Sequence, residues 1–168
     1  MQANNVKITR IFTAIILAMH GVFYENTAFS ALATCTVSTT TPVGFGNYNP
    51  FNSSPVDTTG VLNVSCTSLI IGALVNYTVS LDSGSYGSFA TRKMGNGAYR
   101  LDYNIYTDAT YTTIWGDGTS GTSTNSGSCT IVLGGNCNQN FTAYASVPAR
   151  QNAAVGNYSD TITVTVNY

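Results

Sequence analysis

The sequence predicts an all-β fold, an antiparallel β-sandwich. Short runs of alternating apolar and polar residues recur along the chain, and Gly, Asn, Asp and Ser separate them. β-Branched and aromatic residues dominate these runs, as in CTVST, VLNVSCT and LVNYTVSLD. After the first 30 residues, no stretch has the periodicity of a helix of useful length. Regular short strands with turn residues between them are typical of a sandwich of two sheets.

We expect one domain, because no linker and no internal repeat divides the chain. Strands are predicted within residues 35–39, 61–67, 74–82, 88–94, 99–108, 112–117, 141–147 and 158–168, with a hairpin around Cys129 and Cys137. The polar, low-complexity stretch GTSGTSTNSGS at 118–128 predicts an exposed loop.

The most regular alternation is at the end of the sequence, in YSDTITVTVNY. One face of this predicted strand carries the apolar side chains Ile162, Val164, Val166 and Tyr168, and the other carries Thr and Asn. Domains usually end in a few loose polar residues, whereas here the last residue is still part of the strand. The question is therefore which segment lies beside it.

The first 30 residues are predicted to be a secretory signal peptide. Lys7 and Arg10 precede the apolar run IFTAIILAMHGVF, and small residues follow it. Cleavage after Ser30 or after Ala33 fits this pattern, which leaves residues 31–168 as the mature domain. A single membrane anchor is the alternative, but the apolar run is about 13 residues long, which is short for a membrane span. After cleavage we expect no contact with the membrane.

Removal of this segment leaves a nearly uncharged chain. It contains six Asp and four basic residues, Arg92, Lys93, Arg100 and Arg150, which gives a formal charge of −2. Such a chain has no basic patch for nucleic acid. Its polar surface consists mostly of hydroxyl and amide groups.

The residues that most enzymes need are missing, because the mature chain has no His and no Glu. Nucleophiles that depend on His are excluded, and the Asp residues lie mostly in turns, where carboxylates accept local backbone hydrogen bonds. We expect no enzyme activity, no cofactor and no metal site. Trp115 in WGDG could stack on a carbohydrate, but a buried Trp before an Asp-Gly turn is the favoured interpretation.

Four cysteines remain, Cys35, Cys66, Cys129 and Cys137, and an even number in an exported chain indicates disulfides. Three connectivities are possible. The short turn between Cys129 and Cys137 favours that pair, with Cys35 bonded to Cys66. Zinc binding is disfavoured because there is no His and no CxxC spacing. The stretch LATC at 32–35 matches a lipoprotein box only weakly.

Three blocks of the sequence resemble a known family. The first contains VGFGNY (43–48), GVLNVSC (60–66) and YTVSLDSG (77–84), after Cys35. The second is RKMGNG followed by YRLDYNIYTDATYTTIWGDGT, and the third is the ending AYASVPARQNAAVGNYSDTITVTVNY. Together they resemble the spore coat protein U domain, which is shared by subunits of archaic chaperone–usher pili such as the Csu type. The resemblance covers essentially the whole mature chain.

This resemblance implies an incomplete immunoglobulin-like β-sandwich that lacks its last strand and is completed by donor-strand complementation. Ile162, Val164, Val166 and Tyr168 would then line one wall of a groove that receives the missing strand. A periplasmic chaperone would supply that strand first, with its cations near the Tyr168 carboxylate. Another pilin subunit would replace it as an outer-membrane usher assembles the fibre. The expected location is the periplasm in transit and then the cell surface.

The function that follows from the resemblance is that of a structural pilus subunit that supports adhesion and biofilm formation. Two alternatives stay open, a sugar-binding tip adhesin domain that uses Trp115 and nearby Tyr side chains, and a free-standing secreted coat protein. Cleavage after Ser30 would leave only ALAT before Cys35, and four residues reach about 13 Å, too short for a donated strand. Such a subunit would accept a strand without giving one, whereas cleavage near Gly21 would leave a donor segment.

Overall fold

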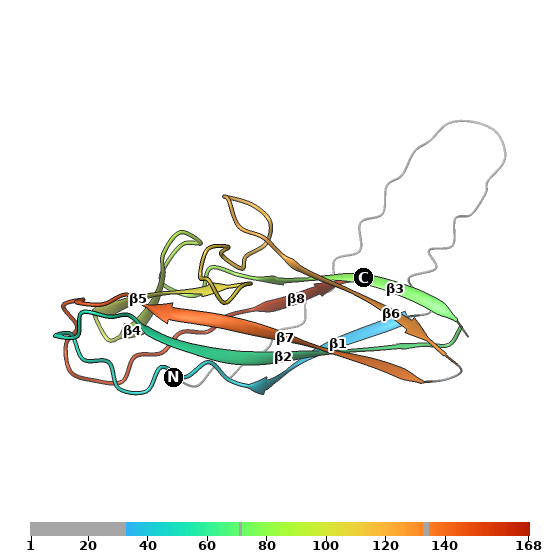
Figure 1. The fold of residues 1–168 in the computed structure, drawn as a ribbon, viewed down its shortest axis with the longest axis horizontal. Coiled ribbons are helices and arrows are strands. Elements are labelled where there is room, and N and C mark those ends of the chain that lie inside the picture. Colours follow the sequence, from blue (N-terminus) through green and yellow to red (C-terminus); the bar gives the residue numbers. More distant parts are fainter. Residues whose placement is uncertain (1–32, 71, 133–134) are drawn as a thin grey trace.

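Two antiparallel sheets make up the part of the chain that the computed structural model describes, residues 33–70, 72–132 and 135–168. The larger sheet contains, in spatial order, β1 (Ala33–Thr41), β2 (Val56–Ser68), β7 (Asn136–Val147), β5 (Tyr99–Tyr106) and β4 (Arg92–Asn96). The smaller sheet contains β6 (Asn125–Ile131), β3 (Ala73–Leu81) and β8 (Val164–Asn167). The longer strands run along the long axis of the molecule (Figure 1). The predicted all-β sandwich is confirmed.

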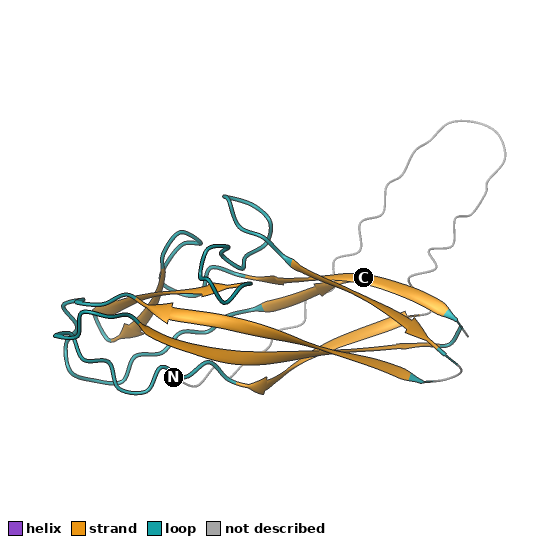
Figure 2. Cartoon of the chain, viewed as in Figure 1, coloured by secondary structure: helices purple, strands orange, loops and turns teal. Residues whose placement is uncertain are grey.

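Loops and turns connect the strands, and no helix occurs among the described residues (Figure 2). It follows that none of these segments supplies a helix that is long and apolar enough to span a membrane. The predicted signal peptide and the cleavage position after Ser30 lie outside the described residues. Ala33, which precedes the other cleavage position, is the first residue of β1.

Several predicted boundaries differ from the structure, most of all those of residues 112–128. Residues 112–117 form no strand and make only single bridges, between Ile114 and Tyr106 and between Trp115 and Ser123. The predicted loop 118–128 ends earlier, because residues from Asn125 onward belong to β6. In β6 the exposed residues Ser126, Ser128 and Thr130 alternate with less exposed ones, of which Cys129 and Ile131 are buried, so the polar composition reflects one exposed face of a strand.

The terminal strand is shorter than predicted because residues 158–163 pass from one sheet to the other. Ser159 exchanges two backbone hydrogen bonds with Gly95 of β4, at 2.8 and 3.1 Å. The carboxylate of the next residue, Asp160, accepts a hydrogen bond from the Tyr103 hydroxyl at 2.7 Å. Only from Thr163 onward does the chain follow β3, where the Thr163 carbonyl accepts a hydrogen bond from Asp82 N at 3.0 Å.

The core lies between the inner faces of the two sheets and follows the period-two alternation of the strands. Val64, Val79 and Ala145 have no exposed surface, and they lie on β2, β3 and β7. Trp115 is also fully buried, and its indole N–H donates a hydrogen bond to the Val79 carbonyl at 2.9 Å. Its single polar group is therefore satisfied inside the core.

Both predicted disulfides are present. Cys35 on β1 and Cys66 on β2 are directly opposed and bonded, with Cα atoms 4.1 Å apart. Cys129 on β6 is bonded to Cys137 on β7, with Cα atoms 5.9 Å apart, and this bond joins the two sheets. The first bond closes a span of 31 residues and the second a span of 8. Covalent links therefore fix one end of the sandwich.

Arg92 on β4 is fully buried and connects several elements through its guanidinium group. Its Nε and Nη2 donate to the Asp82 carbonyl at 3.0 and 2.7 Å, and Nη2 also donates to the Trp115 carbonyl at 2.7 Å. Its Nη1 donates to Asn104 Oδ1 at 2.7 Å. Burial lowers the pKa of Arg92, and nearby negative groups oppose this effect. These bonds satisfy carbonyl groups that no strand partner reaches.

We predict that replacing Cys35 and Cys66 together by Ser lowers the free energy of unfolding more than replacing Cys129 and Cys137. The entropy of the closed loops predicts losses of about 4 and about 2.5 kcal/mol, because the first loop is longer. Urea unfolding of the exported chain, followed by the fluorescence of its single Trp, measures both values. Equal losses in the two double variants would contradict the loop-entropy account.

We predict that Arg92→Lys lowers the free energy of unfolding by about 2–4 kcal/mol. A lysine ammonium cannot reach two carbonyl groups and an amide oxygen with the planar geometry of a guanidinium group. Lys93→Ala is the control, because its ion pair with Asp102 is partly exposed and such pairs contribute less than about 1 kcal/mol. Thermal unfolding that ranks the control as the more damaging change would show that the buried network is not needed.

Candidate functional site

β8 is an edge strand of the smaller sheet. It pairs with β3 on one side, and on its other side it pairs with no strand of the described chain. An open edge presents a row of backbone N–H and C=O groups to any segment that can complete the sheet. Natural sheets usually protect such an edge with charges or Pro, but β8, which reads VTVN, has neither.

The register of β8 shows which backbone groups are open. Thr163 and Asp82 are joined by a backbone hydrogen bond, and the pairing continues with Thr165 opposite Ser80. In an antiparallel pair, alternate residues point their backbone groups to the partner strand. Thr163 and Thr165 therefore face β3, whereas the N–H and C=O groups of Val164 and Val166 point to the open edge.

β1 forms the corresponding edge of the larger sheet. Cys35 and Cys66 have Cα atoms 4.1 Å apart, the short separation of an opposed pair that exchanges no backbone hydrogen bonds. The backbone groups of Cys35 and Val37 therefore point away from β2. β1 and β8 are neighbours across the sandwich, so the two open edges border the same side of the molecule.

The side chains at these edges face the interior. Val164 is 4% exposed and belongs to the core, and Ile162 and Val166 are partly buried and pack against it. Tyr168 is 37% exposed, the most open of the four apolar residues singled out in the sequence. On β1, Cys35 and Val37 are buried. An added strand would thus meet an apolar inner surface and two rows of backbone groups.

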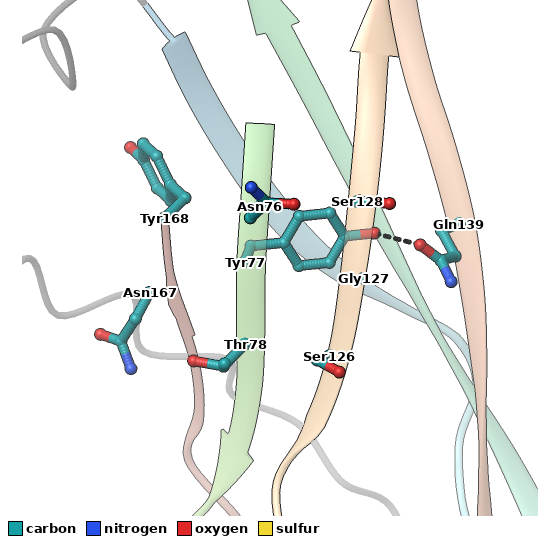
Figure 3. Close-up of a pocket in the computed structure, with 9 residues that line it drawn as sticks. All are labelled: Asn76, Tyr77, Thr78, Ser126, Gly127, Ser128, Gln139, Asn167 and Tyr168. Carbon is teal, nitrogen blue, oxygen red and sulfur yellow. Dashed lines mark hydrogen bonds between the residues drawn. The ribbon is translucent and has the colours of Figure 1, made fainter. Parts of the chain in front are cut away.

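A surface hollow with a volume of about 720 Å³ lies at the end of β8 (Figure 3). The side chains around it come from three strands of the smaller sheet and from β7. They carry hydroxyl and amide groups and no charge: Asn76, Tyr77, Thr78, Ser126, Gly127, Ser128, Gln139, Asn167 and Tyr168. The strands β1, β3 and β8 likewise contain no charged side chain.

A contact between the sheets shapes this hollow. The Tyr77 hydroxyl donates a hydrogen bond to Gln139 Oε1 at 2.7 Å, which the dashed line in Figure 3 marks. Gly127 lies directly opposite Tyr77, and a Cβ there would come within 2.5 Å of the ring carbon Cζ. Burial raises the pKa of the Tyr77 hydroxyl. Sequence analysis missed this contact, because the pairing of Tyr77 with Gly127 depends on strand register.

The described residues contain no group of three or more His, Cys, Asp or Glu side chains that could hold a metal ion. Trp115, considered as a stacking residue, has no exposed surface in this structure. A ligand could therefore reach its ring only if the surrounding core opened. The chemistry that the open side offers is backbone hydrogen bonding and apolar contact.

The family model described as the Spore Coat Protein U domain matches residues 25–165. Comparison with curated proteins found no match.

Among solved structures, similarity was found to a chain of the CsuC–CsuE chaperone–tip adhesion subunit pre-assembly complex, from the archaic chaperone–usher Csu pili of Acinetobacter baumannii. The two chains are 24% identical, with a TM-score of 0.50. The match covers 82% of this chain and 40% of that chain, so this likeness concerns the fold alone. The family model, in contrast, matches most of the sequence, and the chain therefore belongs to the Spore Coat Protein U domain family.

Proposed function

We propose that this chain is a subunit of a surface pilus that is assembled by the chaperone–usher pathway. The observation that carries the proposal is the pair of open edges, β8 and β1, that border the same side of the sandwich. Membership of the Spore Coat Protein U domain family supports it. The similar structure is a complex of a chaperone with a pilus tip adhesion subunit, which also supports a chaperone partner.

In this proposal the missing strand comes from a partner. Its backbone would bond to the outward groups of Val164 and Val166 on one side and of Cys35 and Val37 on the other. Its apolar side chains would cover the inner surface that Ile162 and Val166 leave partly exposed. Filling about five side-chain sites at roughly 1.5–3 kcal/mol each amounts to about 10 kcal/mol, comparable with the whole stability of a domain.

The large free energy of filling the groove suggests the order in which partners would bind. A subunit with an open groove is poorly stable alone, so a periplasmic chaperone would lend a strand first, and another pilin would replace it at an outer-membrane usher. The proposed leader, residues 1–30, would direct export. The finished subunit would lie in a surface fibre that supports adhesion and biofilm formation. The family match begins at residue 25, so cleavage near Gly21 remains the alternative to cleavage after Ser30 or Ala33.

The direct test is export of the chain with and without a chaperone of this class. We expect a stable one-to-one complex when the chaperone is present, and degradation or aggregation of the chain when it is absent, because the apolar groove is then uncovered. Periplasmic extracts analysed by size-exclusion chromatography distinguish the two results. A soluble, stable monomer without chaperone would contradict the proposal and favour the free-standing coat protein.

A second prediction tests whether the outward backbone groups of β8 bind the chaperone. Val166→Pro removes a backbone N–H that points away from β3, so the fold should tolerate it, as edge strands tolerate Pro at such positions. The donated strand would lose one hydrogen bond and meet the Pro ring, so capture by the chaperone should fall strongly. Val166→Ala is the matched control, because it shortens the side chain and keeps the N–H. Equal co-purification of the two variants with the chaperone would show that this edge is not used.

A further inference from the structure

Three tyrosines gather on the outer face of the larger sheet, away from the open edges. Tyr106 on β5 and Tyr144 on β7 are directly opposed and therefore share one face. Tyr111, in the loop after β5, contacts both rings, with centroids 5.6 Å from Tyr106 and 6.5 Å from Tyr144. All three side chains are half-buried, and Tyr144 lies between the inward-facing residues Ala143 and Ala145. We refer to Tyr106, Tyr111 and Tyr144 as the tyrosine cluster.

The loop that presents Tyr111 is held by a dedicated set of hydrogen bonds. Tyr111 has φ of 56°, a conformation that is uncommon for a residue with a large side chain. The Asp108 carboxylate accepts backbone hydrogen bonds from Thr110 at 2.9 Å, Thr112 at 3.3 Å and Thr113 at 2.8 Å, and the hydroxyls of Thr110 and Thr112 also donate to it. Strained residues that the surrounding structure holds in place are frequent at binding sites.

These hydrogen bonds also hold the pKa of Asp108 well below its usual range, first through the Thr110 hydroxyl and then through the backbone of Thr113. The carboxylate therefore stays ionised throughout the physiological pH range, and its hydrogen bonds hold the loop in one conformation over that range. A ring fixed before binding loses little conformational freedom when a ligand arrives.

Polar groups surround the tyrosine cluster. Thr59 on β2 is directly opposite Tyr144, and Asp57, two residues earlier, lies on the same face. Both side chains are exposed. Burial, and after it the negative charge of Asp57, raises the pKa values of Tyr106 and Tyr111. Within the described chain, no hydrogen-bond partner is found for the Asp57 carboxylate or for the three Tyr hydroxyls.

We propose that the tyrosine cluster, with Asp57 and Thr59, binds a neutral glycan. A sugar ring has an apolar C–H face that can stack on an aromatic ring, and a rim of hydroxyl groups that can donate to a carboxylate and exchange hydrogen bonds with Thr and Tyr hydroxyls. β2, β7 and the loop 107–113 contain no Lys or Arg, and Arg92, whose charge acts on Tyr106, is fully buried and donates to carbonyl and amide oxygens. The exposed side chains of these three segments therefore offer no cation to an acidic glycan. Asp57 would repel a negative ligand.

The ring geometry argues against a cation as the ligand. Aromatic cages for quaternary ammonium groups leave a space between rings. Here the centroid separations of 5.6 and 6.5 Å are those of rings in direct edge-to-face contact. The three rings therefore leave no space between them for a cation, and a ligand would bind on their exposed surface. The cluster is also separate from the proposed strand groove, because β2 and β7 lie between β1 and β5 in the sheet. A glycan and a donated strand could bind at the same time.

The experiment is isothermal titration calorimetry on the exported mature chain, bound to its chaperone or, if the chain proves stable without one, free, with cellohexaose, maltohexaose and chitohexaose as probes. We expect saturable binding of at least one probe. Tyr144→Ala and Tyr111→Ala should each weaken it by roughly tenfold or more, whereas Tyr144→Phe, which keeps the ring, should change it only a few-fold. Asp57→Asn should weaken binding without changing the melting temperature.

The matched control is Tyr99→Ala, which removes a tyrosine that is 59% exposed on β5 outside the cluster. It should leave glycan binding unchanged. Asp108→Ala should lower binding although all three rings remain, because it frees the loop that fixes Tyr111. The proposal is overturned if no probe binds at about 10 mM, if Tyr99→Ala is as damaging as Tyr144→Ala, or if choline or heparin binds and the neutral probes do not. Failure of chaperone capture would leave this result unaffected, so the two proposals are tested separately.

Discussion

The backbone along β8 and β1, which on one side pairs with no other described strand, is the constraint on which the rest of the structure depends. A buried or half-buried strand needs partners for its N–H and C=O groups, and water or another chain must supply them at an open edge. In this sandwich the open groups belong to residues whose side chains face the core, Val164 and Val166 on β8 and Cys35 and Val37 on β1. A partner strand at this edge would thus complete the sheets and the core together.

Two disulfides and the buried Arg92 stabilise the rest of the sandwich. The two disulfides join β1 to β2 and β6 to β7 at one end, so that the edge strand β1 is bonded to its neighbour and the two sheets are bonded to each other. Toward the other end, Arg92 supplies hydrogen bonds to the carbonyls of Asp82 and Trp115, which lie outside the strand ladders. Covalent bonds and a buried cation therefore stabilise a domain whose core is incomplete.

The two proposed interaction surfaces differ in the physics that would drive binding. The open edge offers backbone hydrogen bonds and apolar area, which suit a polypeptide strand of almost any sequence with alternating side chains. The tyrosine cluster offers fixed rings beside hydroxyl groups and the Asp57 carboxylate, which suit a neutral ligand of defined shape. A pilus subunit with both would use one surface for assembly and keep the other for contact with its surroundings.

The sequence alone determined the two-sheet class, the disulfide partners and the inward face of the last strand, because strand alternation and short loop spacing are local properties. It missed the boundaries at residues 112–128 and the role of β1 as the second open edge. Only the tertiary structure buried Trp115 against Val79, paired Tyr77 with Gly127, and brought Tyr106, Tyr111 and Tyr144 together. Such contacts depend on strand order and register, which residues distant in the sequence decide jointly and which no local pattern contains.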